Sequence, residues 1–292
     1  MSMLTGLEHI VREQEPLAPY TWLRVGGPAQ YFAEPTSQAE LIQLVKRAHQ
    51  AGMPLRILGG GSNLLVRDEG VKGIVVHLTA AAFSNIAHSG KKITAGGGAK
   101  LGHVISTAVR EGLAGLEMLA GIPGTLGGAL HTNVGTHGGD IGQTVASATV
   151  LTSTGETLVR KRQDLRFGYR ASSLDDLVIL EAELELEPGD PAWLTKQMQQ
   201  QWILKKAGQP LTEQNTVCVF KDAGGRSASS LIEEAGLKGE RRGDVEMCDR
   251  NANFVIAGRK AKAAEVIDLI NHVKKVVAEK SGTDLELAIE IW

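Results

Sequence analysis

The stretch Arg56–Gly70, RILGGGSNLLVRDEG, places three consecutive glycines after a short apolar run. No Gly-Lys-Ser or Gly-Lys-Thr follows, so it is not a Walker A loop, and the extended pattern of Leu64–Val66 does not match a glycine fingerprint that opens a long helix. A glycine-rich strand end can expose several backbone N–H groups and bind an anion. A plain tight turn explains the same residues equally well. The stretch by itself leaves both interpretations open.

A second glycine cluster spans Gly115–Gly135, GLEMLAGIPGTLGGALHTNVG. A helix that begins after Pro123 would leave the N–H groups of Gly124 and Thr125 free to face an anion. The alternative is a closely packed helix start. Two clusters of this kind in one domain favour a long, phosphate-bearing cofactor that runs between them.

Composition sets the broad class. The chain has 292 residues, of which 42% are hydrophobic and 22% charged, enough for two or three domains with cores of their own. A net charge of -2 and an aromatic content of 4% argue against nucleic-acid or membrane-surface binding. Cys218 and Cys248 fit neither a disulfide scaffold nor a metal site. No apolar run approaches 18 residues, so we expect a cytoplasmic protein without a metal.

Hydrophobic periodicity predicts alternating helices and strands in the first half. Thr36 or Ser37 is the candidate N-cap of the first helix. The expected helices cover residues 38–51 and 101–111, and the expected strands cover 54–58, 73–78 and 92–95. Two β-rich runs around a turn predict a hairpin over Ala148–Arg160, and Leu177–Pro188 alternates like a half-buried strand.

The C-terminal part has an α+β pattern. A connecting helix is expected over Trp193–Ala207, with a domain boundary near 188–210. Beyond it the sequence predicts strands over 217–221, 253–258 and 284–292, and helices over 227–236 and 261–280. The expected division is 1–80, 81–190 and 191–292.

Several motifs together resemble one family. RVGGPAQYF, LGGGSNLLV, GLEMLAGIPGTLGGALHTNVG, FGYRASSL, VCVFKD and EEAGLKG occur in the order seen in UDP-N-acetylenolpyruvoylglucosamine reductases, flavoenzymes of bacterial peptidoglycan synthesis. The resemblance runs from about Leu17 to Trp292. It implies an α+β fold with an FAD-binding domain of the vanillyl-alcohol-oxidase (p-cresol-methylhydroxylase) type in two subdomains, 1–80 and 81–190. A substrate-binding domain, 191–292, follows. The short segment between Ser172 and Val178 resembles the branch without an extra substrate-covering loop.

The resemblance also implies the cofactor and the partners. FAD would be reduced by NADPH and would then pass hydride to the vinyl carbon of UDP-N-acetylglucosamine enolpyruvate. The carbanion character that this leaves beside a carboxylate needs nearby positive charge and a proton donor. We expect a monomer. The implied cofactor-binding residues are Gly59, Gly60, Gly61, Ser62, Asn63, Gly121, Ile122, Gly124, Gly128 and Asn133.

Arg170, in GYRAS, matches the family arginine that binds the substrate carboxylate and stabilises the enolate. An arginine suits this role because its planar fork pairs with a carboxylate through two hydrogen bonds and stays charged. Lys221 is a candidate for binding a substrate phosphate or the NADPH tail, although it could equally be a solvated lysine. Asn253 is a further candidate substrate contact.

Cys218, in TVCVFKD, falls where the family has its proton donor, usually serine and in some members cysteine. A thiol is more acidic than a hydroxyl and delivers a proton more readily. The alternative is a buried strand cysteine that acts as a small hydrophobic residue. Alternation along the strand places Cys218 on one face with Thr216 and Phe220.

The last strand departs from the family pattern. In register with the terminal Ile-Trp, Ala288 occupies the position of the catalytic glutamate, and Glu286 and Glu290 lie two residues away on the same face. Three interpretations follow: the chain is an impaired FAD-binding homologue, Glu290 acts as the catalytic carboxylate, or the register differs. We take Glu290 as the catalytic candidate. An oxidase of the wider FAD-domain superfamily is a third possibility, which the GYRASS and FKD matches argue against.

Overall fold

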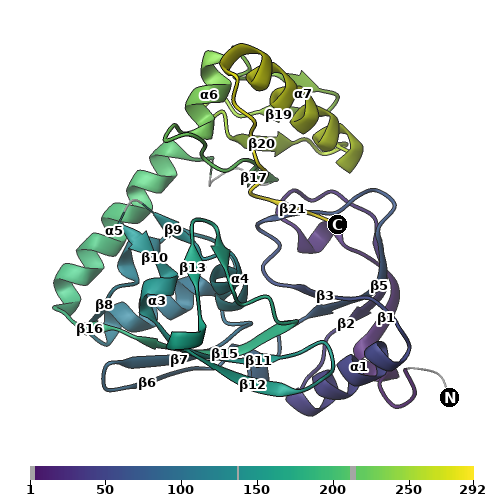
Figure 1. The fold of residues 1–292 in the computed structure, drawn as a ribbon, viewed down its shortest axis with the longest axis vertical. Coiled ribbons are helices and arrows are strands. Elements are labelled where there is room, and N and C mark those ends of the chain that lie inside the picture. The colour runs from purple at the N-terminus through teal and green to yellow at the C-terminus, as the bar shows by residue number, and fades with distance from the viewer. Residues whose placement is uncertain (1–3, 137, 211–214) are drawn as a thin grey trace. The chain divides into compact units, whose positions relative to one another are not determined.

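The computed structural model describes residues 4–136, 138–210 and 215–292 (Figure 1). Internal contacts divide the chain into two compact units. The first contains Met1–Gln14, Gln30–Gly60 and Lys72–Ile203, and the second contains Glu15–Ala29, Gly61–Val71 and Leu204–Trp292. Two short N-terminal segments therefore belong with the C-terminal third of the chain. The three-domain division expected from the sequence stays a prediction.

The first unit contains an antiparallel sheet of five strands in the order β12-β11-β15-β7-β6. The expected hairpin is confirmed, since Val150 of β11 pairs with Leu158 of β12. The expected alternating strand is β15, in which buried apolar residues alternate with glutamates. The strand bounds are β6 Ile86–Ser89, β7 Lys92–Gly96, β11 Val145–Leu151, β12 Thr157–Lys161 and β15 Val178–Glu185.

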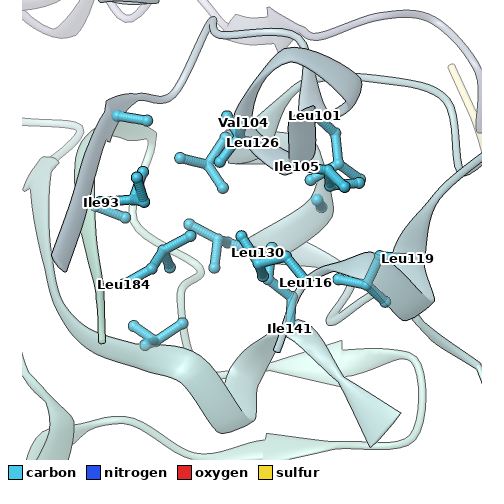
Figure 2. Close-up of a cluster of buried hydrophobic side chains, with 14 of the residues drawn as sticks. Ile93, Leu101, Val104, Ile105, Leu116, Leu119, Leu126, Leu130, Ile141 and Leu184 are labelled. Atoms are coloured by element: carbon cyan, nitrogen blue, oxygen red, sulfur yellow. The ribbon is translucent and has the colours of Figure 1, made fainter. Parts of the chain in front are cut away.

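Helices α3 (Leu101–Arg110) and α4 (Leu126–His131) contribute to the core of this unit, as Figure 2 shows. In α3 the buried residues Leu101, Val104, Ile105 and Ala108 follow helical spacing, which is why the sequence predicted this helix. They belong to one apolar cluster with Ile93 and Leu184 from the sheet, as well as Leu116, Leu119, Leu126, Leu130 and Ile141.

A second sheet, β1-β2-β5-β3, lies mostly within the first unit, and α1 (Gln38–Gln50) belongs to the same core cluster. The predicted N-cap Ser37 is confirmed, because its side chain accepts a hydrogen bond from the Glu40 N–H. The Thr36 N–H in turn donates to the Glu40 carboxylate, which with His9 lowers the pKa of Glu40 to about 2. The strand bounds are β1 Val11–Pro16, β2 Pro28–Ala33, β3 Leu55–Leu58 and β5 Val71–His77.

Shorter elements complete the first unit. Three pairs of two-residue strands are β8 (Leu113–Ala114) with β16 (Glu187–Pro188), β9 (Gly135–Thr136) with β10 (Gly139–Asp140), and β13 (Phe167–Gly168) with β14 (Ala171–Ser172). Helix α2 covers Ala81–Ser84, and α5 (Pro191–Gly208) carries the chain out of this unit and extends the expected connector at both ends. Within the described residues, no helix is both long and apolar enough to cross a membrane.

The second unit is built on an antiparallel sheet of four strands in the order β17-β20-β19-β18, with helices α6 and α7 (Figure 1). Its core joins apolar residues of these elements to Leu23, Val25 and Leu65 from the N-terminal segments. The bounds are β17 Thr216–Cys218, α6 Ala228–Glu234, β18 Arg241–Arg242, β19 Val245–Met247, β20 Phe254–Ala257 and α7 Ala263–Ser281.

The expected last strand over 284–292 is divided between two partners. Leu287 forms an isolated bridge with Phe220, whereas β21 (Glu290–Ile291) pairs in parallel with β4 (Leu64–Leu65). The first pairing is antiparallel and the second is parallel, and they involve different partner segments. Residues 284–292 therefore do not form one continuous strand. The segment that follows the triple glycine thus lies beside the C-terminus, far away in sequence.

Asp68, in the segment that follows the triple glycine, connects this segment to the start of α7. Its two carboxylate oxygens accept hydrogen bonds from the N–H groups of Ala263 and Ala264, at 2.9 and 3.0 Å. These N–H groups belong to the first turn of the helix, where backbone N–H groups have no carbonyl acceptor within the helix. A carboxylate at this end also interacts favourably with the helix dipole. Asp68 therefore caps a helix that begins almost two hundred residues later.

Replacing Asp68 with alanine should loosen the start of α7, because two N–H groups lose their acceptors. We expect a loss of about 1–2 kcal/mol, the usual cost of removing a helix cap. Hydrogen–deuterium exchange at Ala263–Val266 should accelerate, and the thermal midpoint should fall. The neighbouring exposed residue provides the control, since Glu69→Ala should change neither quantity. Equal exchange in Asp68→Ala and the unmodified protein would contradict this role.

Candidate functional site

The two glycine clusters of the sequence come together in the first unit. Gly59 and Gly60 follow the end of β3, and a Cβ atom on Gly60 would lie only 2.7 Å from the Gly124 Cα atom. A Cβ atom on Gly59 would lie 2.9 Å from the Thr125 Oγ1 atom. The backbones meet this closely because neither glycine carries a side chain.

Hydrogen bonds to the segment Gly96–Ala99, which contains three consecutive glycines at the end of β7, hold the start of α4 in place. The Leu126 N–H donates to the Ala99 carbonyl and the Gly127 N–H donates to the Gly97 carbonyl, both at 2.8 Å. The Thr125 hydroxyl caps the helix by accepting from the Gly128 N–H at 3.4 Å. The loop before α4 is therefore fixed on both sides, by β7 and its glycines and by the end of β3.

The N–H groups of this loop fit an anionic ligand. Among the hydrogen bonds of residues 4–136, 138–210 and 215–292, none has the backbone N–H of Gly60, Gly124 or Thr125 as donor. Backbone N–H groups that converge without a protein acceptor form an anion-binding concavity. Three such groups beside a close backbone contact suit the pyrophosphate of FAD, and nothing in the loop carries an opposing charge.

The remaining residues of the first loop belong to the second unit. Gly61 has a left-handed φ of +63°, and a Cβ atom there would lie 2.0 Å from the Tyr20 carbonyl oxygen. Its own carbonyl accepts from the Trp22 N–H at 3.0 Å. The Asn63 side chain donates to the Ala288 carbonyl at 2.8 Å. These contacts explain the residue types structurally, and cofactor contacts by Gly61, Ser62 and Asn63 stay predictions.

Asn133 is buried, and both the nitrogen and the oxygen of its side-chain amide form hydrogen bonds. Its amide nitrogen donates to the Gly168 carbonyl at 2.8 Å, and its amide oxygen accepts from the Gly142 N–H at 3.0 Å. It thus fixes the β13–β14 hairpin, which carries Arg170. Its predicted contact with the cofactor, like those of Gly121, Ile122 and Gly128, remains a prediction.

Arg170 lies in the two-residue turn between β13 and β14, where Gly168 pairs with Ala171. Its φ is +55°, a left-handed conformation that costs a residue with a Cβ about 1–2 kcal/mol. Its side chain is exposed. Strained backbone of this kind often occurs at functional sites, which makes this turn consistent with the role predicted for Arg170.

Cys218 is half-buried at the end of β17, in the second unit. The buried Asn253 side chain donates to the Cys218 Sγ atom at 3.4 Å. Three residues along the chain, the Lys221 ammonium lies 3.3 Å from the Glu286 carboxylate. The second unit therefore brings three predicted site residues, Cys218, Lys221 and Asn253, into one short region, whereas Arg170 belongs to the first unit.

Ala288 is paired with the strand that carries Cys218. Its N–H donates to the Val219 carbonyl at 2.8 Å, directly after the cysteine. Glu290 is exposed, pairs with Leu64, and accepts a hydrogen bond from the Trp292 indole at 3.2 Å. Ala288 is thus the residue next to the Cys218 segment, and the catalytic role of Glu290 stays a prediction.

Two features of the site were not identified from the sequence. Thr125 both caps α4 and contacts the first glycine loop, and a Thr followed by Leu-Gly-Gly at a helix start could have indicated it. The contact between Asn253 and Cys218 joins residues on different strands, so no local pattern indicates it. In the part of the chain that the structure describes, no cluster of three or more His, Cys, Asp or Glu residues could hold a metal.

Comparison with known proteins agrees with this geometry. Residues 29–160 match the FAD binding domain family, and residues 209–292 match the C-terminal domain of UDP-N-acetylenolpyruvoylglucosamine reductase. The glycine loops and the first match define an FAD-binding protein of the vanillyl-alcohol-oxidase type with an additional C-terminal domain, which confirms the fold class predicted from the sequence.

Relatives of nearly full length specify the family. UDP-N-acetylenolpyruvoylglucosamine reductase 2 of Symbiobacterium thermophilum is 40% identical over 97% of this chain and 92% of its own length. The reductase of Moorella thermoacetica is also 40% identical, over 99% and 95%. The crystal structure of the enzyme from Thermus caldophilus is 35% identical, covers 97% of this chain and 99% of its own, and has a TM-score of 0.82. The chain belongs to the UDP-N-acetylenolpyruvoylglucosamine reductase family.

The close approach at Gly60 predicts that Gly60→Ala will reduce FAD content. The added methyl group would push the loop away from Gly124 and disperse the N–H groups that would hold the pyrophosphate of FAD. We expect most of the purified protein to lack flavin absorbance and to remain folded with a lower melting temperature, because the backbone of Gly124 has to shift. Gly102→Ala is the matched control, since that glycine lies in α3 with no atom within 4 Å of its added Cβ. Full flavin content in Gly60→Ala would exclude this loop from the cofactor site.

Proposed function

We propose that Arg170 and Cys218 serve the reaction of this family, the reduction of UDP-N-acetylglucosamine enolpyruvate to UDP-N-acetylmuramate by NADPH. The enzyme is an FAD-dependent oxidoreductase. The observation that carries the proposal is the match of residues 209–292 to the reductase C-terminal domain, in which Cys218, Lys221 and Asn253 lie close together. FAD, when bound, accepts hydride from NADPH and delivers it to the substrate.

Arg170 would bind the substrate carboxylate. When hydride adds to the vinyl carbon, negative charge develops on the adjacent carbon and spreads to the carboxylate oxygens. A guanidinium paired with those oxygens stabilises this charge more than it stabilises the neutral double bond, so it accelerates the step. The strained turn supports the role, since Asn133 and the β13–β14 pairing fix where the side chain begins.

Cys218 would donate the proton that completes the reduction. The S–H bond breaks, its electron pair remains on sulfur, and the carbon beside the carboxylate gains a C–H bond. A donor for this step needs partial access to the site and a stable conjugate base. The half-buried position of Cys218 and its hydrogen bond from Asn253 support both requirements.

Lys221 would bind a phosphate of the substrate or of NADPH. Its ammonium group pairs with the exposed Glu286 carboxylate at 3.3 Å on the adjoining C-terminal segment. For Asn253, the internal hydrogen bonds support a role toward Cys218 more than a direct substrate contact. For Glu290, the exposed position and the hydrogen bond from the Trp292 indole are the observations that bear on its predicted catalytic role.

The alternative of an FAD-binding homologue with impaired turnover has no support in the comparisons. Relatives that match almost the whole chain are named as reductases. We also propose that the enzyme works as a monomer in the cytoplasm, where its nucleotide-sugar substrate and NADPH are dissolved.

A two-step absorbance experiment without oxygen tests the proposed function. NADPH should bleach the oxidised-flavin band, and the enolpyruvyl nucleotide sugar should then restore it. In Cys218→Ala we expect normal bleaching and a return slowed by about 10²–10⁴-fold, the usual effect of losing a general acid. Cys248→Ala is the control, because that thiol is buried in the same unit outside the site. A return as fast as in the unmodified enzyme would exclude Cys218 as the donor.

Arg170→Gln should slow the second half-reaction by about 10²–10³-fold, comparable to losing one group that stabilises transition-state charge. Arg166→Gln is the matched control, since Arg166 is exposed in the same segment and only its backbone has a described contact, with Ser173. Arg170→Gly should be equally slow but at least as stable to heat, because glycine adopts positive φ without strain. Unchanged rates in both Arg170 variants would remove the arginine from the mechanism.

A further inference from the structure

The Asn253 side chain bonds both backbone groups of Phe220, as the main chain of a neighbouring strand would. Its amide oxygen accepts from the Phe220 N–H at 2.9 Å, and its amide nitrogen donates to the Phe220 carbonyl at 2.8 Å. The main-chain carbonyl of Asn253 also accepts from the Val219 N–H. Asn253 is only 7% exposed, so these bonds form away from water. They hold the chain where it leaves β17, and Phe220 there forms the bridge with Leu287 of the C-terminal segment.

This clamp determines which end of the amide faces Cys218. If the amide were flipped, its oxygen would face the Phe220 carbonyl and its nitrogen would face the Phe220 N–H, so both hydrogen bonds would be lost. Leaving two buried groups unpaired is costly. The nitrogen is therefore fixed on the side of Cys218, and its second N–H points at the Sγ atom, 3.4 Å away.

A fixed N–H donor affects the two forms of the thiol differently. A thiolate is a much better hydrogen-bond acceptor than a neutral thiol, and a hydrogen bond to the charged form favours that form. The donor is in place before any substrate binds, because the Phe220 backbone fixes it. Proton release from Cys218 then leaves a charge that already has a partner.

We propose that Asn253 is a positioning residue for Cys218: it fixes the sulfur atom and stabilises the thiolate that remains after proton transfer. The inference rests on the proposed function of Cys218 as proton donor. The proton moves from sulfur to the substrate carbon, the S–H electron pair stays on sulfur, and water later returns a proton to the thiolate.

Other charged groups near this segment are the same in every variant compared. Lys221 and Asp222 follow Cys218 on its own chain, Glu286 lies on the paired C-terminal segment, and Asp249 and Arg250 precede Asn253. Asn253→Asp adds a charge of its own beside the thiol, so the neutral variant Asn253→Ser is the one that reports the loss of the amide alone.

The test is the pH dependence of Cys218 alkylation by iodoacetamide in the purified holoenzyme, followed by mass spectrometry of the peptide. Asn253→Asp keeps an oxygen for the Phe220 N–H but replaces the N–H donors with a negatively charged oxygen. We expect the pH of half-maximal alkylation to rise by at least one unit, so that the thiolate fraction at neutral pH falls about tenfold or more. Buried Cys248 provides an internal check that the fold is intact.

Asn251→Asp is the matched control. It introduces the same charge two residues away, on a side chain that contacts the Gly208 carbonyl and the Asn253 N–H instead of the sulfur. We expect its alkylation profile to stay within about threefold of the unmodified enzyme at every pH. Asn253→Ser, a neutral variant, should shift the profile in the same direction as Asn253→Asp but by less. It serves as the test if the aspartate variant does not fold.

Two outcomes would overturn the proposal. One is an unchanged profile in both Asn253 variants. The other is a uniform change in rate at all pH values, because that would mean the clamp only controls access to the thiol. Alkylation does not require turnover, so the proposed function is tested separately. If Cys218→Ala kept a fast second half-reaction, the proton-donor role would fail even if the profile shifted.

Discussion

The contact between Gly60 and Gly124 is the constraint on which the rest of this structure depends. A Cβ atom at Gly60 would lie 2.7 Å from the Gly124 backbone, so the two loops can meet only as bare main chain. That approach places N–H groups without protein acceptors on both loops. The next residue, Gly61, already belongs to the second unit and is packed against Tyr20. One short run of glycines thus follows the end of a strand, carries a candidate anion-binding N–H group and takes the chain from the first unit into the second.

The segment after the glycines determines how the C-terminal residues are arranged. Asn63 accepts from the Glu290 N–H and donates to the Ala288 carbonyl, while Asp68 caps α7. Ala288 also donates to Val219, so both of its backbone groups are used to join the N-terminal segment to the Cys218 strand. These functions need no side chain at position 288. An alanine there is compatible with the architecture even though the resemblance places a glutamate at this position.

Local patterns in the sequence were sufficient for most elements and for the family. Ser37 and the spacing of Leu101, Val104 and Ile105 predicted two helices, because capping and helical periodicity act over a few residues. The glycine clusters predicted an anion site because each glycine in the sequence marks a position where the backbone has no side chain to cover it. The missed features are contacts between distant residues: Asp68 with α7, Asn253 with Cys218, and the division of the last strand between Phe220 and Leu64. Their partners lie far apart in sequence, and neither partner has an unusual local pattern. The discontinuous second unit was missed for the same reason.

The residue at position 253 is the one whose side chain contacts the Cys218 thiol. A proton donor works best when the base it leaves behind is stabilised, and a thiolate is stabilised by hydrogen-bond donors and destabilised by nearby negative charge. Asn253 supplies a donor whose orientation is fixed by the Phe220 backbone. A thiol is more acidic than a hydroxyl, so its conjugate base is the easier one to leave behind after proton transfer. A donor that the backbone of Phe220 holds in place before the reaction stabilises that base without any rearrangement, and this is why the orientation of one buried amide matters to a proton donor on a neighbouring strand.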